Sequence, residues 1–208
     1  MTEVRTATLD DVARLGRIAA EGFYADPVMR WLYPDDDRRL GLLTLMFTGL
    51  ADDTVPDGGV VHLAADACAA FWRTPEFEHG RMAADRVADA LDEAGEAAGE
   101  APAPSPFAPD ELERLGILGE LMRDHHPHEP HWYLNVVSTL PSHQGRGLGA
   151  AVLRPVLDRC DADGARAYLE STNPRNRTLY LRNGFEAADE IQLPDGPAML
   201  QMWRDPLG

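Results

Sequence analysis

Three closely spaced glycines, Gly145, Gly147 and Gly149, form the part of the chain best suited to chemistry. They follow a short apolar run at residues 134–137, which is typical of a buried strand, and Pro141 ends that strand because proline cannot donate to a β-ladder. A helix is expected to open at about Gly147. Without side chains, the glycines let an anion approach the unpaired N–H groups of the helix N-terminus, where the helix dipole also favours phosphate. The turn is therefore a candidate pyrophosphate cradle.

The same turn also fits a different nucleotide-binding pattern. Residues 145–150 match G-x-G-x-x-(G/A), and Glu170 follows at about the distance expected of an acid that binds a ribose. A dinucleotide-binding domain needs two βαβαβ halves, however, and carries this fingerprint in its first βα turn. Here the motif lies about two-thirds of the way along 208 residues. A nicotinamide-nucleotide domain is therefore the less favoured interpretation.

Two motifs, in order and in spacing, resemble those of the GCN5-related N-acetyltransferase (GNAT) family. Residues 144–149, QGRGLG, match the family's (Q/R)-x-x-G-x-(G/A) motif, and residues 173–185, NPRNRTLYLRNGF, are similar to its N-x-x-A-x-x-x-Y-x-x-x-G-F segment. The resemblance implies an α/β fold of the GNAT type, with a mixed central β-sheet whose parallel strands splay and which is flanked by helices. We expect a single N-acetyltransferase domain over residues 1–208, with an acidic, alanine- and proline-rich insertion at about residues 77–109.

The resemblance also implies acetyl-CoA as the cofactor. In the family, the pantetheine arm pairs with the backbone of the motif A strand, and the pyrophosphate lies on the N–H groups of the glycine turn, a division that suits backbone amides and a helix terminus. The residues expected to bind the cofactor are Val137, Ser138, Thr139, Gln144, Gly145, Arg146, Gly147, Leu148, Gly149, Asn173 and Asn176. Asn176 and Tyr180 are four residues apart and are therefore expected on one helix face.

Two residues are expected to move protons. Transfer of an acetyl group from a thioester to an amine leaves a thiolate, and the resemblance implies that Tyr180 protonates it; free tyrosine has a pKa of about 10 and a thiol about 8.5, so this donor is feasible but weak. The alternative is that Tyr180 only packs beside Phe185. The amine must be neutral to attack, so a base is needed, and Glu170 and Asp26 are the candidates. Direct attack in a ternary complex needs no covalent intermediate.

Aromatic residues and a carboxylate gather at residues 23–34, FYADPVMRWLYP. In the resembling family this first helical hairpin borders the amine site, and aromatic faces with a carboxylate suit a cation. The residues expected to bind the acceptor are Tyr24, Asp26, Trp31, Tyr33 and Trp72. The alternative is a packed corner between two helices and, for Trp72, a place in the core.

The amino-acid composition excludes some classes of binding partner and of chemistry. The net charge of −16 argues against nucleic acid or an anionic membrane. The sequence has no lysine, so Walker A and Schiff-base lysine chemistry are excluded and phosphates must be held by backbone amides and arginines. The two cysteines lack C-x-x-C spacing and are expected to be buried free thiols.

No metal site is expected. His125, His126, His128 and His131 are interrupted by prolines, lack helical spacing for ligands and are interpreted as a solvated loop before a strand. The first residues lack the pattern of a signal peptide and no stretch could span a bilayer, so a cytoplasmic protein is expected, either a monomer or a homodimer.

Hydrophobic periodicity predicts the helices and strands that position these residues. Helices are expected at residues 9–25, 38–50, 84–98, 110–124, 147–163 and 174–183, and strands at residues 3–7, 60–64, 67–73, 134–140, 165–171, 185–191 and 197–204. The strand–glycine turn–helix–strand order predicts a right-handed βαβ unit with two parallel strands.

These expectations combine into one function. The chain is expected to transfer acetyl from acetyl-CoA to a primary amine of a small molecule, with an antibiotic-like amine as one candidate. The alternatives are a non-catalytic acyl-CoA-binding module or sensor, and a nicotinamide-nucleotide domain, which would bind NAD rather than coenzyme A.

Overall fold

The computed structural model describes residues 2–56, 59–76 and 105–207. The elements follow one another in the order β1 (Val4–Thr6), η1 (Leu9–Asp11), α1 (Val12–Phe23), α2 (Pro27–Leu32), α3 (Asp36–Thr54), β2 (Val60–Ala64), β3 (Cys68–Arg73), α5 (Pro109–His125), β4 (Trp132–Thr139), η2 (Pro141–His143), α6 (Leu148–Asp163), β5 (Ala167–Ser171), η3 (Pro174–Asn176), α7 (Arg177–Arg182), β6 (Glu186–Gln192) and β7 (Ala198–Arg204).

One mixed sheet of seven strands runs through the molecule in the order β1-β2-β3-β4-β5-β7-β6. β4 and β5 are parallel, and the other neighbouring pairs are antiparallel. Within the described residues, β4 and β5 pair at Trp132↔Ala167 and Tyr133↔Tyr168 and no further, although both strands continue. The strands therefore splay beyond this point, which confirms the α/β class and the mixed sheet with splayed parallel strands.

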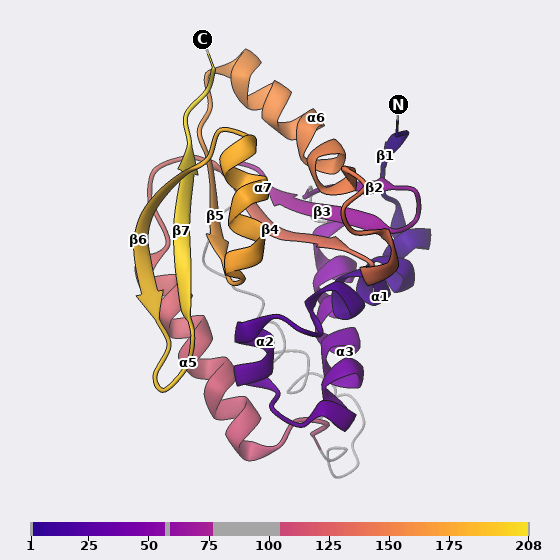
Figure 1. Ribbon diagram of the computed structural model, residues 1–208, viewed down its shortest axis with the longest axis vertical. Coiled ribbons are helices and arrows are strands. Elements are labelled where there is room, and N and C mark those ends of the chain that lie inside the picture. The colour runs from indigo at the N-terminus through magenta and orange to yellow at the C-terminus, as the bar shows by residue number, and fades with distance from the viewer. Residues whose placement is uncertain (1, 57–58, 77–104, 208) are drawn as a thin grey trace.

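Helices cover both faces of this sheet (Figure 1). α6 and α7 lie on the viewer's side, with α7 in front of β5, and α5 crosses behind the β6–β7 hairpin. α1 packs against α3 and against β3 and β4. The splay between β4 and β5 is thus approached by α7 from one face and by the end of α5 from the other.

The helices form where the sequence supplies apolar stripes and caps. In α6, Val152, Leu153, Val156 and Leu157 are buried, while Pro155 lies on the exposed side. Gly164 ends α6 in the left-handed conformation, with φ +67°. These features agree with the predicted boundaries of this helix to within one residue.

Two parts of the chain differ from the expectation. The predicted corner at residues 23–34 contains a further helix, α2, which begins with Pro27 and is capped by the Asp26 side chain. The insertion predicted at residues 77–109 lies mostly outside the described residues, including its predicted helix at residues 84–98. The described end of that stretch packs against the core, because the Phe107 ring is buried and stacks on Tyr33 with ring centroids 6.0 Å apart.

Within the described ranges, the helices are all too short or too polar to pass through a bilayer.

Candidate active site

The predicted cradle has the conformation that glycine allows. Between β4 and α6, Gly145 and Gly147 have φ of +73° and +79°, and a Cβ atom built on either would find no other atom within 4 Å. The backbone at the start of the 16-residue helix α6 therefore stays open to solvent. Unpaired N–H groups at such a helix start are suited to an anion, so the turn fits a pyrophosphate.

Gly149 has a different role from the one expected. A Cβ atom there would lie 3.1 Å from Cδ2 of Leu179, which is on α7. The missing side chain at Gly149 thus allows α6 and α7 to pack closely, and it does not widen the space for an anion.

The other residues of the turn hold its shape. Gln144 donates from Nε2 to the Thr139 carbonyl at 3.2 Å, and Arg146 donates from Nη2 to the Ser142 carbonyl at 3.0 Å. Leu148 turns into the core. The side chains expected to bind the cofactor therefore support the loop in this structure, and the open groups of the turn belong to the backbone.

At the end of β4, the side chains are engaged in other contacts and the backbone groups are the ones open to a ligand. Val137 is buried, Ser138 Oγ donates to the Ile18 carbonyl at 2.9 Å, and Thr139 Oγ1 donates to Cys68 Sγ at 3.1 Å. These bonds tie β4 to α1 and β3. Since β4 has no strand partner on its β5 side beyond Tyr133 among the described residues, its backbone there is available for pairing with an amide-bearing ligand.

Tyr180 is buried on α7, with its ring 6.1 Å from that of Phe185 in an edge-on arrangement. Burial raises the pKa of the Tyr180 hydroxyl well above its ordinary value, and the negative charge of Asp26 raises it further. The hydroxyl therefore stays protonated across the neutral and mildly alkaline range and can act as a hydrogen donor.

Asp26 joins α2 to the loop that follows β5. Its Oδ1 accepts from the N–H groups of Val28 and Met29 at 2.9 and 3.3 Å, and its Oδ2 accepts from Thr172 Oγ1 at 2.6 Å. Burial raises the pKa of the Asp26 carboxyl despite these bonds. Both oxygens are occupied in capping and bridging, so the structure gives this residue a supporting position beside Tyr180.

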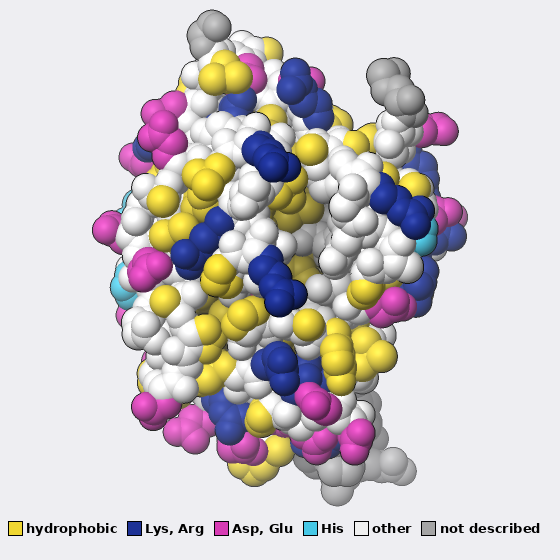
Figure 2. All heavy atoms as spheres, in the orientation of Figure 1, with side chains coloured by type: hydrophobic (Ala, Val, Ile, Leu, Met, Phe, Trp, Pro, Cys, Tyr) yellow, Lys and Arg dark blue, Asp and Glu magenta, His cyan; other side chains and the backbone are white. Residues whose placement is uncertain are grey.

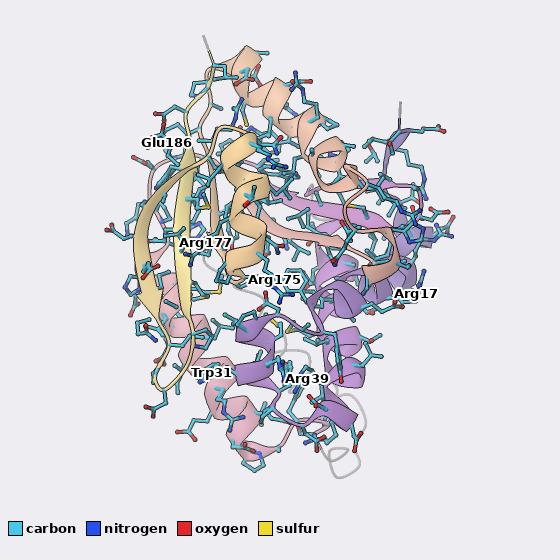
Figure 3. The ribbon with its side chains drawn as sticks, viewed as in Figure 1. Arg17, Trp31, Arg39, Arg175, Arg177 and Glu186 are labelled. Atoms are coloured by element: carbon cyan, nitrogen blue, oxygen red, sulfur yellow. The ribbon has the colours of Figure 1, made fainter. Side chains whose placement is uncertain are left out.

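The two asparagines lie at the start of α7. Asn173 Oδ1 accepts from the Arg175 N–H at 3.1 Å and caps η3, while Asn176 is exposed and makes no side-chain cap bond. Figure 3 shows Arg175 and Arg177 near this end of α7. On the same face, arginine side chains surround a hollow in the surface, with hydrophobic atoms at its base (Figure 2).

The predicted acceptor residues separate into two groups. Tyr24 and Trp31 are half-buried: the Tyr24 hydroxyl donates to the Asp36 carbonyl at 3.1 Å, and Trp31 Nε1 donates to the Pro194 carbonyl at 3.1 Å. Trp31 therefore links α2 to the turn between β6 and β7, as Figure 3 shows. Tyr33 and Trp72, in contrast, have no exposed surface and lie in the core.

Glu170 lies in a buried polar cluster and not at an exposed strand end. Its side chain is 3% exposed, and its Oε1 is 3.6 Å from Nδ1 of His126, whose side chain is also 3% exposed. Burial and the nearby charge of Glu170 together raise the pKa values of the Tyr133 and Tyr168 hydroxyls. Glu170 thus approaches the splay on the face covered by the end of α5, because residues 168 and 170 of a strand share a face.

The interpretation of the histidines as a solvated loop was wrong for two of them. His126 and His131 are buried against Tyr168, with ring centroids 5.5 and 5.3 Å away, whereas His125 and His128 are exposed. Burial lowers the pKa of His131, whose Nδ1 donates to the Glu129 carbonyl at 2.7 Å. The alternation of Tyr168 and Glu170 gave a signal for a shared face, but the helix end that covers this face is not visible in the sequence.

No group of three or more metal-ligating side chains lies together among the described residues.

Comparisons with known proteins agree with this geometry. A model of the "Acetyltransferase (GNAT) family" matches residues 65–185. An uncharacterised N-acetyltransferase of Schizosaccharomyces pombe is 36% identical over 62 residues, which make up 30% of this chain and 25% of that protein. The chain therefore matches only about a quarter of that protein's length.

Solved structures match over the whole chain. A histone acetyltransferase HPA2 and related acetyltransferase from Corynebacterium glutamicum has a TM-score of 0.64 and 25% identity, over 100% of this chain and 97% of that one. The PaiA N-acetyltransferase of Thermoplasma acidophilum, solved in complex with coenzyme A, has a TM-score of 0.55 and 10% identity, over 99% of both chains. The second likeness concerns the fold alone.

Proposed function

The chain belongs to the acetyltransferase (GNAT) family, and we propose that it transfers an acetyl group from acetyl-CoA to a primary amine of a small molecule. The observation that carries this proposal is the open turn at Gly145 and Gly147, which lies at the start of α6 and follows the strand that splays from β5. A nucleotide domain of the NAD type is disfavoured, because this chain has one mixed sheet with a single parallel pair.

The residues around the splay fit acetyl-CoA. The backbone of residues 144–149 would hold the pyrophosphate, and the backbone of residues 137–139 would pair with the pantetheine amides. With lysine absent from the sequence, Arg146 in the turn and Arg175 and Arg177 near the start of α7 (Figure 3) are the cations considered for this site. When bound, acetyl-CoA supplies an acetyl group activated as a thioester.

Tyr180 is the proposed acid. Burial and the neighbouring Asp26 charge keep its hydroxyl protonated, so it can donate a proton to the sulfur as the carbon–sulfur bond breaks. Tyr180 is carried by α7, which packs directly on α6 through Leu179 and Gly149. This support links the proposed acid to the proposed cofactor cradle.

Glu170 is the proposed base. Its Oε1 is buried and has no hydrogen-bond partner, whereas both oxygens of Asp26 accept hydrogen bonds. Glu170 would accept a proton from the amine nitrogen as the carbon–nitrogen bond forms, on the face of the sheet opposite Tyr180. The structure thus favours Glu170 over Asp26 for this step.

The acceptor is proposed to be a cationic amine. Two buried carboxylates, on Asp26 and Glu170, lie close to the splay and would favour a positive charge. The segments HPHEPHWYL, LPSHQGRGLG, YLESTNPRN and LPDGP, and more loosely residues 71–76, resemble puromycin N-acetyltransferase. Puromycin is therefore the first amine to test.

The proposal is tested by release of free thiol from acetyl-CoA across a panel of primary amines that includes puromycin. We expect thiol release that depends on one class of amine, with the acetylated amine identified by mass spectrometry. A reaction without amine measures hydrolysis and is the control. If coenzyme A binds in calorimetry but no amine is acetylated, the chain is instead an acyl-CoA-binding module or sensor; thermal stabilisation by NAD and not by coenzyme A would overturn both.

A further inference from the structure

The buried Glu170 carboxylate needs a compensating charge. Taking an ionised carboxylate out of water is unfavourable unless hydrogen bonds and an opposite charge replace the lost hydration. Tyr133 and Tyr168 contribute neutral hydroxyl groups. The imidazole of His126 lies beside this carboxylate, with Nδ1 3.6 Å from Oε1.

The imidazole of His126 is held in place from two sides. Its ring meets the ring of Tyr133 at 80° and 4.8 Å and the ring of Tyr168 at 85° and 5.5 Å. Both arrangements are edge-to-face, which is a preferred geometry for aromatic pairs. His126 is also the first residue after α5, so the helix end fixes its backbone. The ring therefore has little freedom to turn Nδ1 away from Glu170.

The neighbouring histidine cannot take this role. Nδ1 of His131 donates to the Glu129 carbonyl at 2.7 Å, since a carbonyl can only accept. Burial lowers the pKa of His131, and a positive charge on His126 lowers it further. The contacts therefore place His126, and not His131, beside the Glu170 carboxylate.

We propose that His126 is a positioning residue for Glu170: it fixes the carboxylate at the splay of β4 and β5. This proposal rests on the proposed function, in which Glu170 accepts a proton from the amine. In this role His126 acts through Glu170 and not on either substrate.

The groups that face this pair come from four strands and one loop. They are Arg73 on β3, Tyr133 on β4, Tyr168 on β5, Gln201 on β7 and, in the loop before β4, His131. Gln201 donates to the Tyr168 hydroxyl at 2.7 Å and to the His125 carbonyl at 3.0 Å, so it ties β7 to the end of α5. Arg73 is a permanent cation near Tyr133.

The first test needs no catalysis. In the full chain with isotope-labelled histidine, the ring signals of His126 are followed by NMR at one fixed pH, with and without Glu170→Gln. We expect Glu170→Gln to shift the ring signals of His126, because the Glu170 carboxylate lies 3.6 Å from Nδ1. The exposed His125 and His128 serve as internal controls and should not move. Ring signals of His126 that do not respond overturn the proposal, whether or not the chain acetylates amines.

The second test uses the amine that the panel identifies. His126→Ala should lower kcat by about tenfold or more while the KM for acetyl-CoA stays the same, because only the orientation of the base is lost. His126→Asn, which keeps a donor near the Nδ1 position, should recover most of kcat. His131→Asn is the matched buried control. Equal losses in His126→Ala and His131→Asn would indicate general damage to the cluster and would overturn the positioning role.

Discussion

On the face of the sheet that carries α6 and α7, the splay between β4 and β5 lies near the exposed backbone of the glycine turn. On the face that carries the end of α5, the splay is bordered by buried side chains. The first side is built from Gly145 and Gly147 and from a loop closed by its own carbonyls. The second is built from Glu170, His126 and two tyrosines that come from separate elements. The two sides differ in how much of the chain each requires.

This difference has a chemical meaning. Phosphates and amides are the same in every molecule of a common cofactor, and backbone groups in a short contiguous turn are sufficient to bind them. Proton transfer from a variable amine needs a carboxylate whose environment is set by packing, and such packing draws on distant parts of the chain. We expect substitutions in the glycine turn to change cofactor binding, and substitutions of the buried side chains proposed to transfer protons to change turnover.

The largest effect is expected at Glu170. Glu170→Gln keeps the shape of the side chain but removes the proton acceptor, so turnover should fall by about 10²- to 10⁴-fold while coenzyme A affinity stays the same. Steady-state rates and calorimetry measure the two quantities. A variant that retains its rate would show that the α5 side of the sheet has only a structural role.

Tyr180 should give a somewhat smaller loss. Tyr180→Phe keeps the packing beside Phe185 but removes the donor, and we expect kcat to fall by about 10²-fold with cofactor affinity unchanged. Because burial and Asp26 raise the pKa of the hydroxyl, the neutral donor persists as the pH rises, and Tyr180 should cause no loss of rate below about pH 10. A pH–rate profile tests this point, and an alkaline limb below pH 9 that disappears in Tyr180→Phe would contradict it.

Substitution in the glycine turn should change the affinity for coenzyme A. Gly147→Ala forces a side chain into a left-handed conformation at the start of α6, and we expect coenzyme A to bind about tenfold more weakly. Gly164→Ala is a matched control, because Gly164 also has positive φ and open space around it but lies at the other end of the same helix. Both variants should lose similar stability. Equal affinities in calorimetry would remove the turn from cofactor binding.

Asp26 should show the smallest effect on rate. Asp26→Ala removes the cap of α2 and should lower the unfolding free energy by about 1 kcal/mol. Asp26→Asn keeps an acceptor, and since burial raises the pKa of the carboxyl, the ionised form destabilises the folded chain at neutral pH. The folded chain binds more protons than the unfolded one as the pH falls through the folded pKa, so any advantage of Asp26→Asn at pH 7 should shrink on acidification.

Urea unfolding at pH 7 and at about pH 5 measures that trend. If Asp26→Asn instead lowered kcat as strongly as Glu170→Gln, Asp26 would be the base, and the division between the two sides would not hold.

The sequence by itself determined the features that depend on neighbours along the chain. The glycine turn, the start of α6 at Leu148, its end at Gly164 and the hairpin of β6 and β7 follow from local steric preferences and apolar periodicity. The parallel pair of strands followed from the strand–turn–helix–strand order.

Only the tertiary structure decided what surrounds each functional side chain. The burial of His126 beside Glu170, the contact of Gly149 with Leu179 and the bridge from Asp26 to Thr172 join residues that are 44, 30 and 146 positions apart. Such contacts depend on which helix end covers which face of the sheet, and no local preference encodes that choice. A site that binds phosphate through backbone groups can therefore be predicted from one stretch of sequence. The environment of a buried carboxylate, in contrast, is a property of the folded chain.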